Sequence, residues 1–313
     1  MFFRKAKVRI LLVLMLSAVC LCTGLLIFAQ NDADDIVDRG VYQRVRADGQ
    51  TYLACLGSDM IEVYDQQYKK LYDHMVGDDG AAIISCCISD LDGDETDEIL
   101  LITGEDGNEY GTELLILVVQ IGTANEQPGN DSSLENAVDT ISMKVIYKKD
   151  MAYINPWKIQ TCDVDGDGKT EISIGAYKTA RFHPVMARRP FIYEWHGNAI
   201  SPKWLGSRLS RPFDDYIFAD IDADDIDELI SIEHLEDGKR AVNSYAWKGF
   251  GFESIGESAA FDDILSISKT LTMEERPEKI EAQVMEAGKQ RRIILRYCGE
   301  MLNHSYLCVD EEN

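Results

Sequence analysis

Three short stretches of this chain carry the same arrangement of acidic residues, and their recurrence restricts the possible folds more than any other feature. The stretches are residues 90–98, 163–171 and 220–228. Each has Asp at its first, third and fifth positions and Glu at its ninth, and each leads into apolar residues. Repetition of one motif along a chain is typical of folds built from repeated structural units.

Carboxylates this close together repel one another unless a cation lies between them. Ca²⁺ takes six to eight oxygen ligands from carboxylates, carbonyls and water. Alternating Asp residues in a tight turn can direct three carboxylates inward, and Gly166 and Gly168 permit such a turn in the second stretch. The ninth residue returns a carboxylate from the next strand, and the seventh offers its main-chain carbonyl. We therefore expect about three Ca²⁺ ions, one in each acidic loop.

An EF-hand also begins with alternating Asp residues, but it requires a bidentate Glu at position twelve and a helix on each side. Position twelve is Leu101, Ile174 and Ser231 in the three stretches. The residues that follow each stretch also have the character of a β-strand. The sequence therefore argues against EF-hand and dockerin folds and places each acidic loop between two strands.

Strand patterns cover most of the chain beyond residue 40. Runs rich in Val, Ile and Tyr alternate with polar residues at 60–68, 113–119, 143–149, 190–195 and 291–298. A second repeated element, Tyr-x-Trp-x-Gly, occupies residues 193–197 and 245–249. Together these repeats predict one four-stranded sheet about every 50–60 residues.

The predicted fold is all-β, a β-propeller of about five blades, with four and six as alternatives. It would occupy residues 41–313, and its outer units, residues 41–75 and 261–309, lack an acidic loop. An N-terminal strand is expected to complete the last blade, and a short helix is expected around residues 274–285. The polar segment 123–140 is expected to be a surface loop.

The repeated motif, Asp-x-Asp-Gly-Asp-Gly-x-x-Glu-Ile in its fullest form, resembles the FG-GAP/VCBS repeats of the integrin α-chain N-terminal propeller superfamily. The resemblance covers roughly residues 83–255 and implies Ca²⁺ binding through loop positions one, three, five, seven and nine, the seventh through its carbonyl. The implied ligands are Asp90, Asp92, Asp94, Thr96 and Glu98; Asp163, Asp165, Asp167, Lys169 and Glu171; and Asp220, Asp222, Asp224, Ile226 and Glu228.

The second stretch keeps the family pattern best, and the other two depart from it. Glu95 and Asp225 replace Gly at position six, and Ala223 replaces Gly at position four. A left-handed backbone at position six is tolerable for Asp but less so for Glu. We therefore expect the first loop to be distorted or to bind its ion more weakly. The Phe-Gly and Gly-Ala-Pro signature that names the family is not evident.

The N-terminal part of the chain predicts export. Residues 1–9 are basic and would stay in the cytoplasm, and residues 10–29 form an uncharged apolar run long enough to span a bilayer as a transmembrane helix. Residues 30–40 read as a polar linker. An uncleaved anchor is favoured for 10–29, with a cleaved signal sequence and a lipoprotein modified at Cys20 as alternatives. All three place the following domain outside the cytoplasm.

The cysteines beyond residue 40 have irregular spacings, which argues against a zinc site. Cys298 and Cys308 flank a predicted hairpin turn and are the best candidates for a disulfide, which an exported protein can form. For the others, burial as small hydrophobic side chains is at least as well favoured as disulfide bonding: Cys55, Cys86, Cys87 and Cys162.

The net charge of −24 disfavours nucleic acid as a partner, and a hydrophobic content of 45% argues against disorder. Trp195 and Trp247, at equivalent repeat positions, are expected to pack within blades, whereas Trp157 and Trp204 are candidates for an exposed aromatic surface. The basic segment 181–189 is expected to form ion pairs with nearby carboxylates rather than bind an anionic ligand.

The sequence therefore favours a calcium-binding, extracytoplasmic β-propeller that acts as a membrane-anchored binding or scaffolding module. In this interpretation the ions are structural, and the partner is an unknown protein or carbohydrate at the cell surface. One alternative is a carbohydrate-active enzyme, a hydrolase or lyase, although no catalytic set of residues can be singled out. Another is a non-catalytic subunit of an envelope assembly.

Overall fold

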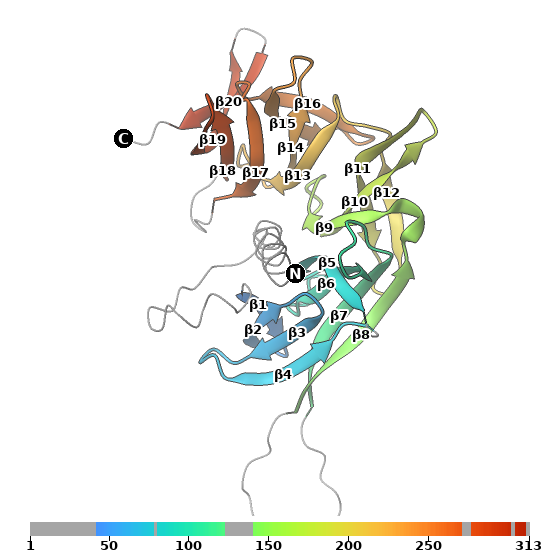
Figure 1. The fold of residues 1–313 in the computed structure, drawn as a ribbon. Helices are drawn as coiled ribbons and strands as arrows, with labels where there is room; N and C mark the ends of the chain where they lie inside the picture. The colour runs from blue at the N-terminus through green and yellow to red at the C-terminus, as the bar shows by residue number, and fades with distance from the viewer. Residues whose placement is uncertain (1–41, 78–79, 123–139, 271–276, 302–303, 311–313) are drawn as a thin grey trace, which may run out of the picture.

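The computed structural model of the protein describes residues 42–77, 80–122, 140–270, 277–301 and 304–310 (Figure 1). In these ranges the chain forms twenty strands and one 3₁₀ helix, η1 (Ala152–Ile154). The predicted anchor, the linker and nearly all of the polar segment lie outside the described residues. Within those ranges, no helix is long and apolar enough to cross a membrane.

The strands form five four-stranded antiparallel sheets, each built from four consecutive strands in chain order. The first sheet contains β1 (Tyr42–Ala47), β2 (Gln50–Leu56), β3 (Met60–Tyr64) and β4 (Lys70–Met75). The second contains β5 (Ala81–Ser89), β6 (Glu98–Glu105), β7 (Glu113–Gly122) and β8 (Thr140–Asp150). The third contains β9 (Pro156–Cys162), β10 (Glu171–Ala180), β11 (His183–Trp195) and β12 (Ile200–Leu205).

The last two sheets meet along one edge. The fourth sheet contains β13 (Phe213–Ala219), β14 (Glu228–His234), β15 (Arg240–Trp247) and β16 (Phe252–Glu257). The fifth contains β17 (Asp263–Lys269), β18 (Ile280–Glu286), β19 (Lys289–Met301) and β20 (His304–Asp310). A single parallel pairing of Glu257 in β16 with Tyr306 in β20 connects them.

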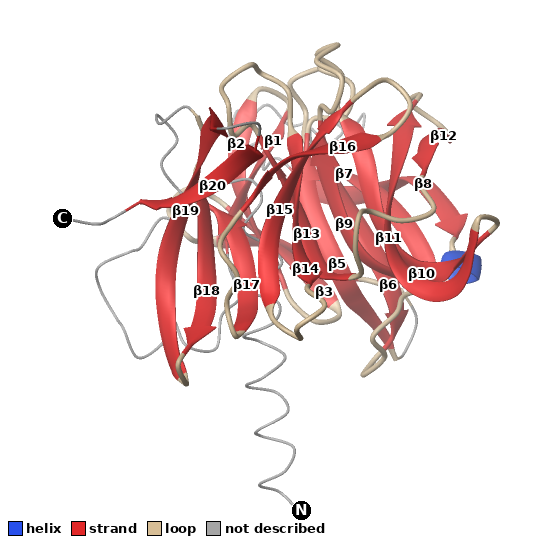
Figure 2. Cartoon of the chain, turned by 90° about the horizontal axis from the view of Figure 1, so that it is seen from above, coloured by secondary structure: helices blue, strands red, loops and turns tan. Residues whose placement is uncertain are grey.

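The sheets follow one another along an arc in chain order (Figure 1), and the strands run between two edges where the connecting loops lie (Figure 2). Four clusters of buried apolar side chains each lie between two successive sheets. Leu101 of β6 shares one cluster with Val45 of the first sheet, and Leu100 shares another with Ile174 of the third. The arrangement is propeller-like, which agrees with the prediction of an all-β fold with about five repeated sheets.

Burial along the strands follows from this stacking. In β6 every residue from Glu98 to Gly104 is buried, because sheets cover both of its faces. In β8, the outer strand of the same sheet, partly buried and exposed residues alternate instead. The predicted strands in 60–68, 113–119, 143–149, 190–195 and 291–298 all occur, in β3, β7, β8, β11 and β19.

Two expectations about the C-terminal part are wrong. The expected helix around residues 274–285 is replaced, over its described part, mainly by strand β18, in which Ile280, Ala282 and Val284 are buried. Helix-forming residues such as Glu, Gln, Ala and Met had suggested a helix, but pairing with β17 and β19 outweighs that local preference. The fifth sheet also takes its four strands from residues 263–310, and the N-terminal strand β1 pairs within the first sheet.

The fourth strand of each of the first four sheets contains a one-residue bulge against its third strand. In the third sheet, Ile192 pairs with Trp204 and Tyr193 with Pro202, so Lys203 is the extra residue. The extra residues in chain order are Leu71, Ile146, Lys203 and Ile255. Three of them are apolar, and Lys203 alone is charged.

The cysteines behave as predicted. Cys298 of β19 and Cys308 of β20 form a disulfide, which is typical of proteins in oxidising compartments outside the cytoplasm. The remaining described cysteines are buried and form no disulfide: Cys55, Cys86, Cys87 and Cys162.

Candidate metal centre

The three acidic loops occupy equivalent places in the second, third and fourth sheets. They connect β5 to β6, β9 to β10 and β13 to β14, so each joins the first and second strands of its sheet. Equivalent connections lie at the same edge of the sheets, and contacts between neighbouring loops, described below, confirm this placement. The prediction that each loop lies between two strands is confirmed.

All three loops share one backbone conformation. The fourth and sixth residues have positive φ angles in every loop: Gly93 (78°) and Glu95 (69°), Gly166 (70°) and Gly168 (76°), and Ala223 (66°) and Asp225 (66°). The expected distortion of the first loop is therefore absent from its backbone. Instead, Glu95 and Ala223 adopt the left-handed conformation that glycine accepts at lower cost.

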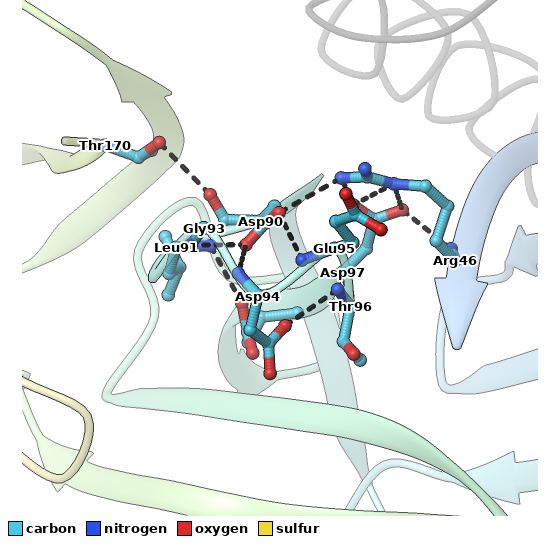
Figure 3. A network of polar contacts seen from close by, with 10 residues as sticks. Arg46, Asp90, Leu91, Gly93, Asp94, Glu95, Thr96, Asp97 and Thr170 are labelled. Atoms are coloured by element: carbon cyan, nitrogen blue, oxygen red, sulfur yellow. Dashed lines mark hydrogen bonds and ion pairs between the residues drawn. The ribbon is translucent and has the colours of Figure 1, made fainter. Parts of the chain in front are cut away.

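The first Asp of each loop organises the turn. In the first loop, the Asp90 carboxylate accepts hydrogen bonds from the backbone N–H groups of Gly93 (2.7 Å) and Glu95 (3.0 Å), as Figure 3 shows. Asp163 and Asp220 accept the corresponding bonds from the fourth and sixth residues of their loops. A carboxylate at position one thus satisfies the inward N–H groups of the turn.

Two further carboxylates of each loop bind its backbone. The ninth residue accepts the N–H of the second, at distances of 2.9, 3.1 and 3.1 Å in chain order, through Glu98, Glu171 and Glu228. The fifth residue accepts the N–H of the seventh in all three loops, through Asp94, Asp167 and Asp224. Identical bonding in three places explains why three different sequences keep one loop shape.

Each loop also brings three carboxylates together, with oxygens within 4.8 Å of one another. The sets are Asp90, Asp92 and Asp94; Asp163, Asp165 and Glu171; and Asp220, Asp222 and Glu228. A donor set made only of carboxylate oxygens fits a hard cation such as Ca²⁺. These three groups could hold metal ions.

The other predicted ligands have different surroundings. Asp167 accepts a hydrogen bond from the side-chain ammonium of Lys169 at 2.8 Å, on the exposed side of its loop. Glu98 is buried beneath the first loop, where it binds the N–H of Leu91. Metal binding through the seventh-position carbonyls stays a prediction for Thr96, Lys169 and Ile226.

Burial makes the ninth residues of the first and third loops weaker acids than an ordinary Glu. It raises the pKa of Glu98 to about 7 and the pKa of Glu228 to about 8, and the Asp carboxylates of each loop add to the shift. A positive ion among these oxygens would stabilise the ionised carboxylates and reverse both shifts.

The second loop already contains a positive group. The Nζ atom of Lys203 lies 2.5 Å from Oδ2 of Asp165 and 2.6 Å from Oε1 of Glu171. Its side chain is only 11% exposed, and it reaches the loop from the bulge in β12. Burial raises the pKa of Glu171, and the ammonium of Lys203 acts against that shift.

Reciprocal hydrogen bonds join the acidic loops to the neighbouring sheets. The N–H of Asp163, first in the second loop, donates to the carboxylate of Asp227 at 3.0 Å. The N–H of Asp227, eighth in the third loop, donates back to the Asp163 carbonyl at 2.8 Å. The same reciprocal pair occurs between Arg46 and Asp97 and between Asp220 and Glu278.

The junction between the first and second loops uses a variant of this contact. The hydroxyl of Thr170, eighth in the second loop, donates to the carbonyl of Asp90 at 3.1 Å (Figure 3). Gly166 of the second loop also lies so close to Ile226 of the third that a Cβ atom would be 2.8 Å from its side chain. In each of these contacts, the first residue of one loop or its equivalent bonds to the eighth residue of the next or its equivalent. These first-to-eighth contacts run through all five sheets along one edge.

The residues that make these contacts were not singled out from the sequence. Asp97, Thr170 and Asp227 occupy the eighth position, directly before the ninth-position Glu, and this shared position was the available signal. Glu278 is the equivalent residue two places before β18. Lys203 lies in a different strand from the loop that it contacts, and only the strand alignment reveals its place.

Several charged side chains outside the acidic loops form ion pairs with each other. In the basic segment 181–189, Arg188 forms the expected kind of ion pair, with Glu109 at 3.0 Å, whereas the buried Arg189 donates to backbone carbonyls instead. Asp214 accepts bonds from His234 (2.6 Å) and Arg240 (2.8 Å). Burial acts to raise the pKa of Asp214, but these two partners outweigh it and hold that pKa below its ordinary value.

Trp195 and Trp247, predicted to pack within the blades, pack in apolar clusters between neighbouring sheets, and the two candidates for an exposed aromatic surface are partly buried as well. Trp157 and Trp204 are only partly exposed and pack in the same apolar cluster as Trp247. Trp204 contacts Phe252 edge to face, with ring centroids 5.0 Å apart. Trp195 packs in the cluster between the second and third sheets.

Comparison of the chain with protein families gives no match. Comparison with curated proteins also gives no match.

Proposed function

We propose that the protein is a calcium-binding, extracytoplasmic member of the FG-GAP/VCBS type, anchored in a membrane, that serves as a binding or scaffolding module. One observation carries the proposal: three loops with the same bonding pattern each gather three carboxylates at one edge of a propeller-like fold. A solvated acidic turn has no need for the same inward-facing arrangement three times.

A structural role for the ions is supported by the contacts between loops. The first residue of each acidic loop is a member of a carboxylate set and also bonds to the next sheet. An ion that fixes this residue would therefore fix the contact between two sheets. Calcium concentrations outside cells are sufficient to fill sites of modest affinity, and binding to the folded state alone stabilises it.

The proposed location rests on two further observations. The disulfide between Cys298 and Cys308 suggests an oxidising compartment. The apolar run at residues 10–29, preceded by basic residues, suits an uncleaved anchor with the domain outside. The proposed partner is a protein or a carbohydrate at the cell surface.

The proposal is tested by calcium titration calorimetry of the full-length protein in a mild detergent. We expect saturable Ca²⁺ binding whose stoichiometry or affinity falls in a double variant, Asp92→Asn with Asp222→Asn, which removes one charge from the first and third carboxylate sets. Saturable binding that survives unchanged in the double variant would place the ions elsewhere, and absence of binding would refute the proposal.

A further inference from the structure

The second acidic loop differs from the other two in having a lysine side chain among its carboxylates. We infer that Lys203 supplies the cation of this loop, so that the protein binds Ca²⁺ only at the first and third loops. The inference rests on the proposed function, because it divides the proposed calcium sites into two kinds.

The geometry supports substitution of the ion by the ammonium group. Ca²⁺ lies about 2.3–2.6 Å from its oxygen ligands. The Nζ atom of Lys203 lies 2.5 Å from Asp165 and 2.6 Å from Glu171, two of the three carboxylates in the second set. With respect to these two oxygens, the ammonium therefore stands where a calcium ion would stand.

Comparison of the sheets shows that this lysine occupies a defined structural position. Lys203 is the extra residue of the β12 bulge, and the residues at the matching bulges of the second and fourth sheets are Ile146 and Ile255. Both isoleucines pack against apolar clusters, which contain Leu91 and Ile221 of the first and third loops. Where the bulge residue is apolar, it brings no positive charge to the carboxylates. Arg46 reaches only one member of the first set, lying 3.4 Å from Asp90 and 2.6 Å from Asp97.

Burial makes the ammonium difficult to displace. The Lys203 side chain is 11% exposed and Glu171 is 3% exposed. Removing one partner of a buried ion pair leaves the other charge uncompensated, which is strongly unfavourable. A Ca²⁺ ion entering the second loop would have to expel the ammonium from this site, whereas no lysine ammonium lies among the described carboxylates of the first and third sets.

The test counts bound calcium ions on the full-length protein by native mass spectrometry and equilibrium dialysis. The wild type should bind two ions, and Lys203→Ile, which copies the neighbouring bulges, should bind three. Lys203→Met, which keeps the length of the side chain, is a second variant if the first does not fold. Lys148→Met removes an exposed lysine from β8, two residues from Ile146, and should leave the count at two.

Three ions on the wild type would overturn the inference while the proposed function stands. A count of two on both the wild type and a folded Lys203 variant would also overturn it, since the lysine would then not be the cause. If the wild type binds none, the proposed function fails, and thermal unfolding in chelator decides the role of Lys203. If Lys203 supplies the positive charge of the second loop, the Lys203→Ile protein should then melt roughly 5 °C or more below the Lys148→Met protein. Equal melting temperatures of the two variants would refute this role of Lys203.

Discussion

At the scale of single residues, the acidic loops retain their shape even where the sequence opposes it. Glu95 and Ala223 hold positive φ angles of 69° and 66° at positions where the second loop has glycine. The hydrogen bonds to the first Asp impose this conformation, so the local preference of the side chain is outweighed. The sequence pattern predicted three acidic loops between strands, but not that three unlike sequences would share one backbone.

The positive φ of Ala223 predicts that Ala223→Gly stabilises the protein. Relief of the left-handed conformation, less the entropy that glycine adds to the unfolded chain, gives about 0.5–1 kcal/mol in the free energy of unfolding. Denaturant unfolding at fixed calcium concentration measures the change. The matched control is Gly168→Ala, whose Cβ would meet no atom within 4 Å and which should destabilise through the backbone alone. A less stable Ala223→Gly protein would contradict this account of the loop.

The raised pKa values of Glu98 and Glu228 predict a pH dependence of stability in the absence of calcium. Each carboxyl binds its proton more tightly in the folded protein, with pKa values of about 7 and 8, than in the unfolded chain, where the ordinary value is 4.5. The free energy of unfolding in chelator should therefore fall as the pH rises from about 5 to about 8.

Saturating Ca²⁺ should remove this pH dependence, because the ion stabilises the ionised carboxylates. Melting temperatures at several pH values, with chelator and with calcium, measure both effects. The double variant Glu98→Gln with Glu228→Gln should lose the fall in chelator, and retention of the full fall by this variant would assign it to other groups.

At the scale of strands and loops, the sequence predicted the strands but not the contacts between strands and between sheets. The alternation of apolar and polar residues predicted the strands, and the repeat predicted their grouping into four-stranded sheets. β18 was predicted as a helix because helix-forming residues dominate it, while its pairing with β17 and β19 is a long-range property. The reciprocal bond between Asp163 and Asp227 joins residues of separate loops and leaves no local pattern.

That reciprocal bond makes Asp227 a test of the junction between sheets. Asp227→Ala would leave the N–H of Asp163 without its acceptor in a partly buried site, which should lower the free energy of unfolding by about 1–3 kcal/mol. Asp227→Asn keeps a side-chain oxygen that can accept the bond and should cost clearly less. Denaturant unfolding compares the two variants, and equal losses would show that the bond is not the cause.

At the scale of the whole molecule, five sheets with apolar clusters between neighbours give a propeller-like structure that follows from the repeat. The expected completion of the last sheet by an N-terminal strand is wrong, because each described sheet is made from consecutive strands. One edge of the molecule carries the acidic loops, and first-to-eighth contacts run along that edge from the first sheet to the fifth. Calcium at this edge would link local ion binding to the cohesion of the whole domain.

The most direct test of this central claim is the thermal unfolding of the full-length protein in a mild detergent, with excess chelator and then with millimolar Ca²⁺. The account predicts a lower melting temperature in chelator, full recovery on addition of Ca²⁺, and a smaller response in the Asp92→Asn, Asp222→Asn double variant. A melting temperature of the wild type that is the same with chelator and with Ca²⁺ would contradict it.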